Sequence, residues 1–204
     1  MAYEFLIPIG FVVVFVTIVI LAVIAEKKRN ELFSSFAQRR GFQYEKKGDK
    51  NYLDIFSLGG IGHTKIAKRM IKGRSRGKRI EIFDYSYTVG GGRSSRTIVQ
   101  TVLKTSLEKP LPDFTLWVKR WDLMFHKPKL PEVKMPDSNI YAFYGSPEVM
   151  EVMNHKIFPY LASIKYTPNI EVRNNQLIVY QISKKSKDLH TFLENAKKVV
   201  SLLE

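Results

Sequence analysis

The chain has 204 residues, of which 45% are hydrophobic, and this composition is typical of a folded globular protein. Lys and Arg outnumber Asp and Glu by 33 to 19, so the formal net charge is +14. Because the sequence contains no cysteine, it excludes a disulfide framework, a cysteine-ligated metal site and a cysteine nucleophile.

A long apolar segment opens the chain. Residues 5–25 contain no charged side chain, and a helix of this length covers roughly 30 Å, the thickness of the hydrocarbon core of a membrane. The segment therefore predicts a transmembrane anchor over residues 1–26. A cleaved signal peptide is the alternative, but such a peptide has a basic region before a shorter apolar stretch.

The charges that flank this segment predict its orientation. Lys27, Lys28 and Arg29 follow it at once, whereas Glu4 is the only charged residue before it. Because basic flanks stay on the cytoplasmic side, we expect the N-terminus outside and the rest of the chain, as a soluble domain, in the cytoplasm.

Four stretches after the anchor have the β-branched and aromatic composition of strands. They are residues 65–72, 79–89, 96–105 and 114–118. The connections between them are too short for helical crossovers, so we expect antiparallel pairing. Together with the helical segments, this order predicts an α+β fold with a mainly antiparallel sheet and flanking helices.

A proline-rich stretch divides the predicted domain. Residues 126–138 contain three prolines and few residues able to form a core. They predict a connector between an N-terminal lobe, residues 27–125, and a C-terminal lobe, residues 139–204.

Three local signals organise the C-terminal lobe. Ser146 is the predicted N-cap of a helix that Pro159 should end. Asn174 and Asn175 predict a tight hairpin turn, because asparagine tolerates positive φ. An apolar stripe after Asp188 predicts an amphipathic helix that packs on the core.

Residues 82–102 carry a recognisable signature. It consists of Phe83-Asp84-Tyr85-Ser86-Tyr87-Thr88, Gly90-Gly91-Gly92-Arg93-Ser94-Ser95 and Gln100-Thr101-Val102. The pattern resembles an uncharacterised bacterial family of single-pass membrane proteins that have an F-D-Y-x-Y-T, Gly/Ser-turn and Q-T-V signature. The resemblance implies a bacterial cytoplasmic (inner) membrane and the topology described above, and it implies no activity.

On its residues alone, the signature predicts a β-hairpin whose glycines supply positive φ. Its distinctive side chains and turn residues are Asp84, Tyr85, Tyr87, Gly90, Gly91, Gly92 and Arg93. A hydrogen bond across the hairpin is a structural role as open to Asp84 as a catalytic one. Phosphate binding by the glycine backbone is the alternative, but the lysine and the spacing of a P-loop are absent.

The sequence offers no persuasive catalytic or metal-binding constellation. His63, Asp84 and Ser94 occur in an order that some serine hydrolases use, but without a nucleophile elbow or an oxyanion-hole motif. The four histidines lack metal-ligand spacing. We therefore expect no enzyme activity and no cofactor, with an enzyme of unrecognised type as an alternative.

Basic residues concentrate in one segment, and no Asp or Glu occurs from residue 55 to residue 80. They are Lys65, Lys68, Arg69, Lys72, Arg74, Arg76, Lys78 and Arg79. Together with Lys27, Lys28 and Arg29, they form a predicted contact with anionic lipid headgroups, worth about 1 kcal/mol per basic residue. A solvated strand face and a nucleic-acid backbone contact are the alternatives.

These observations favour a membrane-tethered interaction or scaffold protein, such as an accessory subunit of a membrane complex. The expected partners are the lipid bilayer and an unidentified protein or membrane complex. Binding of anionic lipid or nucleic acid through the basic segment is the alternative function.

Overall fold

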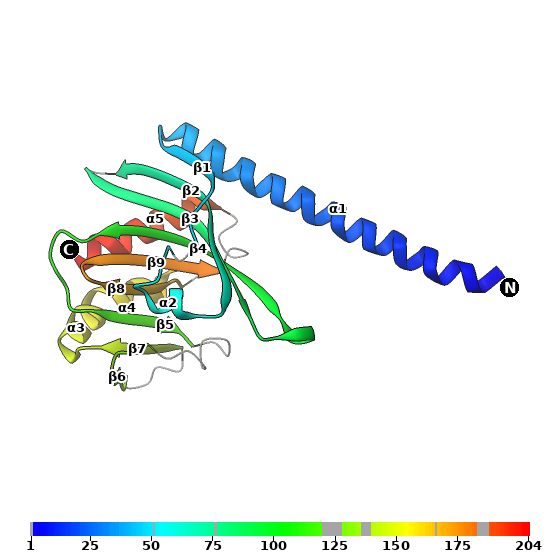
Figure 1. Ribbon diagram of the computed structural model, residues 1–204. Helices are drawn as coiled ribbons and strands as arrows, with labels where there is room; N and C mark the ends of the chain where they lie inside the picture. Colours follow the sequence, from blue (N-terminus) through cyan, green and yellow to red (C-terminus); the bar gives the residue numbers. More distant parts are fainter. Residues whose placement is uncertain are drawn as a thin grey trace.

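The computed structural model describes residues 2–50, 52–75, 77–119, 128–135, 140–165, 167–182 and 188–204, with side chains from residue 12 on. In this part of the chain, nine strands form one sheet in the order β1-β2-β3-β4-β9-β8-β5-β7-β6 (Figure 1). All paired neighbours run antiparallel. The predicted α+β class with a mainly antiparallel sheet is therefore confirmed.

The strands are β1 (Gln43–Lys47), β2 (His63–Ser75), β3 (Lys78–Val89), β4 (Arg96–Ser106), β5 (Phe114–Val118), β6 (Glu132–Val133), β7 (Tyr141–Gly145), β8 (Asn169–Arg173) and β9 (Gln176–Ile182). The helical elements are α1 (Ala2–Arg39), α2 (Ser57–Gly60), the 3-10 turn η1 (Gly92–Ser94), α3 (Pro147–Val152), the π-helical η2 (Met153–Ile157), α4 (Phe158–Ser163) and α5 (Leu189–Leu203).

The N-terminal segment is helical, but it corrects the predicted membrane topology. Within the described part of the chain, no helix combines the length and the apolar composition needed to cross a membrane. As far as this part of the chain shows, the predicted transmembrane helix and single-pass topology are wrong.

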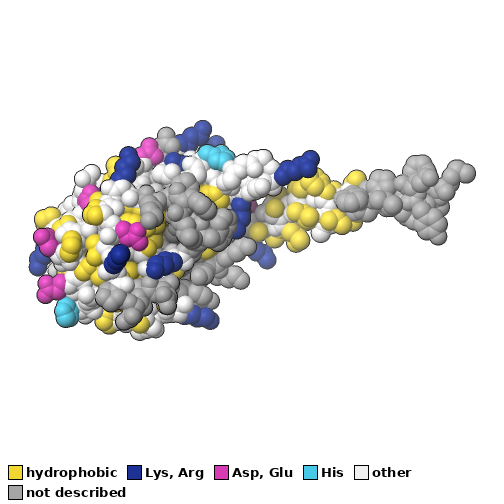
Figure 2. All heavy atoms as spheres, turned by 90° about the horizontal axis from the view of Figure 1, so that it is seen from below, with side chains coloured by type: hydrophobic (Ala, Val, Ile, Leu, Met, Phe, Trp, Pro, Cys, Tyr) yellow, Lys and Arg dark blue, Asp and Glu magenta, His cyan; other side chains and the backbone are white. Residues whose placement is uncertain are grey.

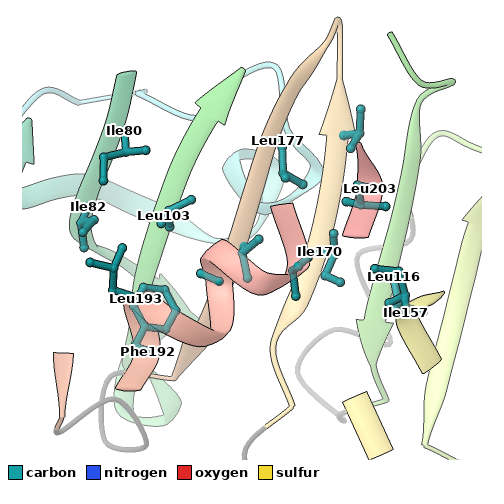
Figure 3. Packing of buried hydrophobic residues seen from close by; sticks show 14 of the residues in the cluster. Ile80, Ile82, Leu103, Leu116, Ile157, Ile170, Leu177, Phe192, Leu193 and Leu203 are labelled. Atoms are coloured by element: carbon teal, nitrogen blue, oxygen red, sulfur yellow. The ribbon is translucent and has the colours of Figure 1, made fainter. Parts of the chain in front are cut away.

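The main core lies between the sheet and the helices on one of its faces. Leu103 of β4, Leu177 of β9 and Ile170 of β8 point toward α5, where Phe192 and Leu193 pack against them (Figure 3). All five side chains are buried. The predicted amphipathic helix after Asp188 is thus confirmed, and its carboxylate caps the helix by accepting a hydrogen bond from the His190 N–H.

The opposite face of the sheet carries a second core. It contains Tyr85 and Tyr87 of β3, Tyr180 of β9 and Trp117 of β5, all buried beneath the segment that includes α2. Because side chains alternate along a strand, each of the long strands serves both cores.

Two local predictions for the C-terminal part have different outcomes. The hairpin turn between β8 and β9 is confirmed, since Asn174 and Asn175 have φ of 49° and 62°. Pro159 does not end the preceding helix, because it lies in the first turn of α4, where its missing N–H costs little. The π-helical η2 separates α4 from α3.

The sheet continues from the predicted N-terminal lobe into the predicted C-terminal lobe. Strand β4 pairs with β9, so that Val102 lies opposite Tyr180, and β5 pairs with both β7 and β8. Of the predicted connector, residues 126–127 and 136–138 lie outside the described residues, as does residue 125. The division into two lobes stays a prediction.

Candidate interaction site where α1 meets the sheet

Helix α1 leaves the sheet and projects away from it with an uncovered apolar surface (Figure 1). We call residues 12–24 its apolar section, in which the large hydrophobic side chains are between 43% and 68% exposed. Five successive residues, 12–16, are all in this range, and successive residues of a helix turn by about 100°. The apolar surface therefore surrounds the helix and is not confined to one stripe.

The second half of α1 packs on the sheet. Phe33 and Ala37 are buried in the main core beside Ile71 of β2 and Ile82 of β3. One helical turn earlier, polar residues replace these apolar ones on the same face of α1. The junction between the helix and the sheet is thus apolar at one end and charged at the other.

The charged end of the junction is built around Asp84 of β3, whose side chain is 1% exposed. Arg29 of α1 donates from Nε to Oδ2 and from Nη2 to Oδ1 of Asp84, both at 3.0 Å. Arg69 of β2 donates from Nε to Oδ2 at 3.0 Å and from Nη1 to Oε1 of Glu26 at 2.6 Å. We call Glu26, Arg29, Arg69 and Asp84 the junction network.

The two acids and two bases of the junction network balance each other in formal charge. This balance matters because a buried ion without a partner carries a desolvation penalty of several kcal/mol. The Arg29 guanidinium also lies 4.8 Å from the centre of the Phe33 ring, which adds a cation–π contact inside α1. The network therefore fixes α1 against the sheet in one position.

A local irregularity in β2 places Arg69 in this network. Its φ is 56°, in the left-handed region that residues other than glycine rarely adopt. The register between β2 and β3 shifts between Lys68 and Ile71, so Arg69 lies in a bulge of the strand. Bulges re-aim side chains, and here the bulge accompanies an arginine that is 7% exposed and bonded to Asp84.

The signature residues have structural roles in this junction. Asp84 lies directly opposite Thr101 of β4, and the Thr101 hydroxyl donates to Asp84 Oδ1 at 3.0 Å. Of the two roles open to Asp84, the structure thus shows the hydrogen bond across the hairpin. On the other face, Gln100 donates from Nε2 to the Tyr87 hydroxyl at 3.2 Å.

Beside the network, Tyr44 of β1 has a buried hydroxyl without a hydrogen-bond partner in the described residues. Desolvation raises the pKa of this phenol, although the nearby Arg69 acts in the opposite direction. Tyr44 therefore stays neutral next to the charged groups.

A second buried ion pair lies on the other face of the sheet. Glu171 of β8 is completely buried, and its Oε1 is 3.2 Å from Nη2 of Arg173 and accepts a hydrogen bond from the Ser57 N–H. Burial raises the pKa of Glu171, while Arg173 and the backbone donors at Ser57 and Leu58 oppose this shift. This pair holds the start of α2 on the sheet, and no pattern in the sequence predicts it.

The predicted basic segment does not form a single patch. Along the β2–β3 hairpin, His63 pairs with Thr88 at one end and Ser75 pairs with Lys78 at the other. Thirteen residues of β2 at 3.3 Å each span roughly 40 Å. Residues 65 and 68 therefore lie toward the end that α1 projects beyond, whereas residues 74, 75 and 77–79 lie at the opposite end.

Several of the predicted contact residues are engaged within the protein. Lys72 lies 2.9 Å from Glu45, Lys78 lies 3.1 Å from Glu108, and Arg79 lies 2.9 Å from Glu81. Lys78 also contacts Glu204. Burial lowers the pKa of Lys78, but the hydrogen bonds that its ammonium donates to Glu204 and Glu108 outweigh this effect and raise it. Arg29 and Arg69 belong to the junction network.

The other predicted contact residues are more accessible. Lys27 and Lys28 are exposed on α1, directly after the apolar section. Lys65, Lys68 and Arg74 have no ion-pair or hydrogen-bond partner among the described residues. Arg76 lies outside the described residues.

The glycines of the signature form the tip of the β3–β4 hairpin. Gly90 and Gly92 have φ of 82° and 55°, as the predicted turn requires. Residues 90–97, which include Gly91 and Arg93, are all exposed. The tip is therefore a protruding surface loop.

An open groove of about 640 Å³ runs beside α1 at the end of the sheet. Ile18 and Val23 of the apolar section line it together with the acidic Glu26 and the basic Lys27 and Lys46. Basic side chains also gather at the end of the domain that borders the apolar part of α1 (Figure 2). A surface that is apolar on one side and basic on the other suits an amphiphilic partner whose polar part is anionic.

No group of three or more His, Asp or Glu side chains is placed to bind a metal ion within the described part of the chain. The buried Asp84 is bonded to Arg29 and Arg69 inside the protein. The arrangement thus suits a mechanical connection between a helix and a sheet.

The sequence predicts one apolar helical face within residues 30–40 that includes Phe33 and Ala37, and both are buried. The polar residues of the same face, Glu26 and Asn30, were not predicted to pack inward. Glu26, Asn30, Phe33 and Ala37 recur at intervals of three and four residues, which is the spacing of one helical face. Asn30 accepts a hydrogen bond from Arg69 at 3.3 Å. This periodicity is the signal from which Glu26 and Asn30 could also have been placed on the packed face.

No protein-family model and no curated protein sequence matches the chain. Among solved structures, the crystal structure of the mycobacterial trehalose monomycolate transport factor A, TtfA, is similar to it with a TM-score of 0.55. The sequences are 14% identical, and the match covers 86% of this chain and 94% of that chain. At this identity the similarity shows a common fold, and the membership suggested by the signature stays a prediction.

Proposed function

We propose that the protein is an accessory interaction protein that attaches to a bacterial membrane through α1 and presents its sheet domain to a transport assembly there. The observation that carries this proposal is the exposed apolar section of α1, held on the domain by the buried junction network. Contiguous apolar surface of this kind marks an interaction site.

Lipid is the occupant that the geometry of α1 favours. A groove in a partner protein covers one stripe of a helix, whereas a lipid layer can take up the apolar side chains of a short helical section that does not cross the membrane, in whichever direction they point. The apolar section has exposed Val, Ile, Leu and Phe side chains in every direction. Lys27 and Lys28 follow the section after Ala25 and Glu26, and there they would face anionic headgroups.

The structural similarity supports the accessory role. The protein with the similar fold is named as a transport factor, and its name refers to trehalose monomycolate. We extend to this chain only the general role, an auxiliary component of membrane transport, without assigning a cargo. The absence of enzyme activity belongs to the same proposal.

Flotation of the whole chain with neutral phosphatidylcholine vesicles tests the attachment. Two isoleucines with nearly equal exposure provide a matched pair, since Ile18 of α1 is 60% exposed and Ile140 before β7 is 59% exposed. A lysine at the centre of an apolar contact costs about 3 kcal/mol, so Ile18→Lys should reduce flotation roughly 100-fold. Ile140→Lys should float like the unmodified chain.

High salt should leave the flotation of the unmodified chain unchanged, because an apolar contact is not screened. If the unmodified chain stays unbound to vesicles, the lipid attachment is refuted and a cleft in a partner protein becomes the occupant of α1. Equal losses for Ile18→Lys and Ile140→Lys would also contradict the proposal.

A further inference from the structure

We propose that the tip of the β3–β4 hairpin binds anionic lipid headgroups and forms a second contact with the membrane to which α1 attaches. This inference rests on the proposed attachment of α1. It assigns a role to Arg93 and the exposed glycine turn, residues 90–97, which the junction network does not involve.

The first argument is the direction in which the hairpin extends. Its tip projects from the sheet on the same side as the N-terminal half of α1 (Figure 1). Both elements start from one point, because Asp84 of β3 is bonded to Arg29 of α1. From this point, β3 runs toward the tip and α1 runs toward its N-terminus, and both directions lead away from the main core (Figure 1).

The second argument is reach. Seven residues of strand from Asp84 to Gly91 cover roughly 23 Å at 3.3 Å per residue. The same distance along α1, measured from Arg29 at 1.5 Å per residue, leads to about residue 14 in the apolar section. Lys27 and Lys28 lie within about 3 Å of Arg29 along the helix, so the tip is long enough to extend past their level to the surface of a membrane that these lysines border.

The third argument is charge. The sequence contains no Asp or Glu from residue 85 to residue 107, and Arg93 and Arg96 are exposed at the tip. Lys65 and Lys68 of β2 lie toward the same end of the sheet. The two acids of β3, Glu81 and Asp84, are buried and paired with arginines, so they do not offset this basic surface.

The partner is argued from the combination of these features. Exposed basic groups beside an apolar section fit a lipid surface, whose anionic headgroups and apolar interior lie next to each other. The glycines leave the backbone of the tip without bulky side chains, so the backbone and the arginines can approach a headgroup layer closely. Zwitterionic headgroups without net charge would not provide this attraction.

A single fluorescent label tests the contact, because the chain has no cysteine and an introduced one is unique. Ser94 at the tip and Ser106 at the far end of β4 are both exposed serines, so Ser94→Cys and Ser106→Cys form a matched pair. The labelled whole chain is bound to phosphatidylcholine vesicles that carry a headgroup-attached quencher, with or without phosphatidylglycerol.

We expect the label at position 94 to be quenched more strongly when phosphatidylglycerol is present, and the label at position 106 to be unaffected. In the anionic vesicles, Arg93→Gln should lower the ratio of bound to free tip about fivefold, the effect of one basic residue near the surface. Arg74→Gln at the opposite end of the β2–β3 hairpin should leave it unchanged. Raising the salt concentration should release the tip while α1 stays bound.

The outcomes separate this inference from the proposed function. If the chain floats with neutral vesicles but the label at position 94 is quenched equally with and without phosphatidylglycerol, or not at all, the hairpin contact is refuted and the attachment through α1 stands. Equal quenching at positions 94 and 106 also refutes it. If the chain binds no vesicles, both proposals fail.

Discussion

Asp84 connects three elements of the molecule through one carboxylate. Arg29 reaches it from α1, Arg69 from β2, and the Thr101 hydroxyl from β4. A carboxylate that accepts several charge-assisted hydrogen bonds in a buried position has little freedom to move. At the residue scale, the position of α1 therefore depends on this single side chain.

Asp84→Asn should destabilise the whole chain by about 3–5 kcal/mol, because it leaves two guanidinium groups without their buried anion. Urea denaturation of the whole chain measures the loss. Glu45→Gln is the control, since Glu45 is 47% exposed and pairs with Lys72 at the surface, where an ion pair is worth about 0–1 kcal/mol. A loss for Asp84→Asn no larger than that of the control would contradict the role of the network.

The sequence permits part of this site to be predicted. The bond between Asp84 and Thr101 follows from hairpin register, which is a local property of the signature. The bonds from Arg29 and Arg69 do not, because they depend on how a helix packs on a sheet and on a bulge in β2. The concentration of basic residues around Arg29 and Arg69 in the sequence instead predicts a lipid contact, because a sequence does not show which charges are paired inside the fold.

At the scale of elements, α5 shows how much a periodic pattern determines. Its apolar stripe predicted a helix that packs on the core, and Phe192 is 2% exposed in the main core (Figure 3). The same periodicity does not tell which strands the helix covers. The π-helical η2 and the helical turn α2 also lack a signal, since their conformations depend on the surrounding core.

Phe192→Ala should lower the free energy of unfolding of the whole chain by about 3–5 kcal/mol, because the buried ring leaves a cavity that the sheet cannot fill. Thermal or urea denaturation checks this value. Phe36→Ala is a suitable comparison, since Phe36 is only partly buried against the same core. A melting temperature for Phe192→Ala equal to that of the unmodified chain would show that α5 does not seal the core.

At the scale of the whole molecule, one sheet joins segments that are distant in sequence. Thr101 of β4 lies opposite Gln181 of β9, and β5 is placed between β7 and β8. Local turn signals predict antiparallel hairpins, but they contain no information on which hairpins adjoin. For this reason the segments that form strands could be predicted, whereas the order of the strands in the sheet could not.

The arrangement of charge is also a property of the whole molecule. In sequence, the basic residues of 65–79 are adjacent, whereas in the structure they extend along the β2–β3 hairpin and several are paired with acids. The tip of the β3–β4 hairpin, more than ten residues further along the chain, lies on the side toward which α1 projects (Figure 1). Folding of the β2–β3 hairpin thus separates basic residues that are neighbours in sequence. It also brings Lys65 and Lys68 toward the end of the sheet at which the tip of the β3–β4 hairpin lies.

The central claim is that the apolar section of α1 attaches this domain to a membrane. The most direct measurement is fractionation of bacterial cells that produce the whole chain, with the membrane fraction washed in high salt before the protein is quantified. We predict that most of the chain stays with the membranes after the wash and is released by detergent, because the contact is apolar. Recovery of most of the chain in the fraction without membranes would contradict the claim.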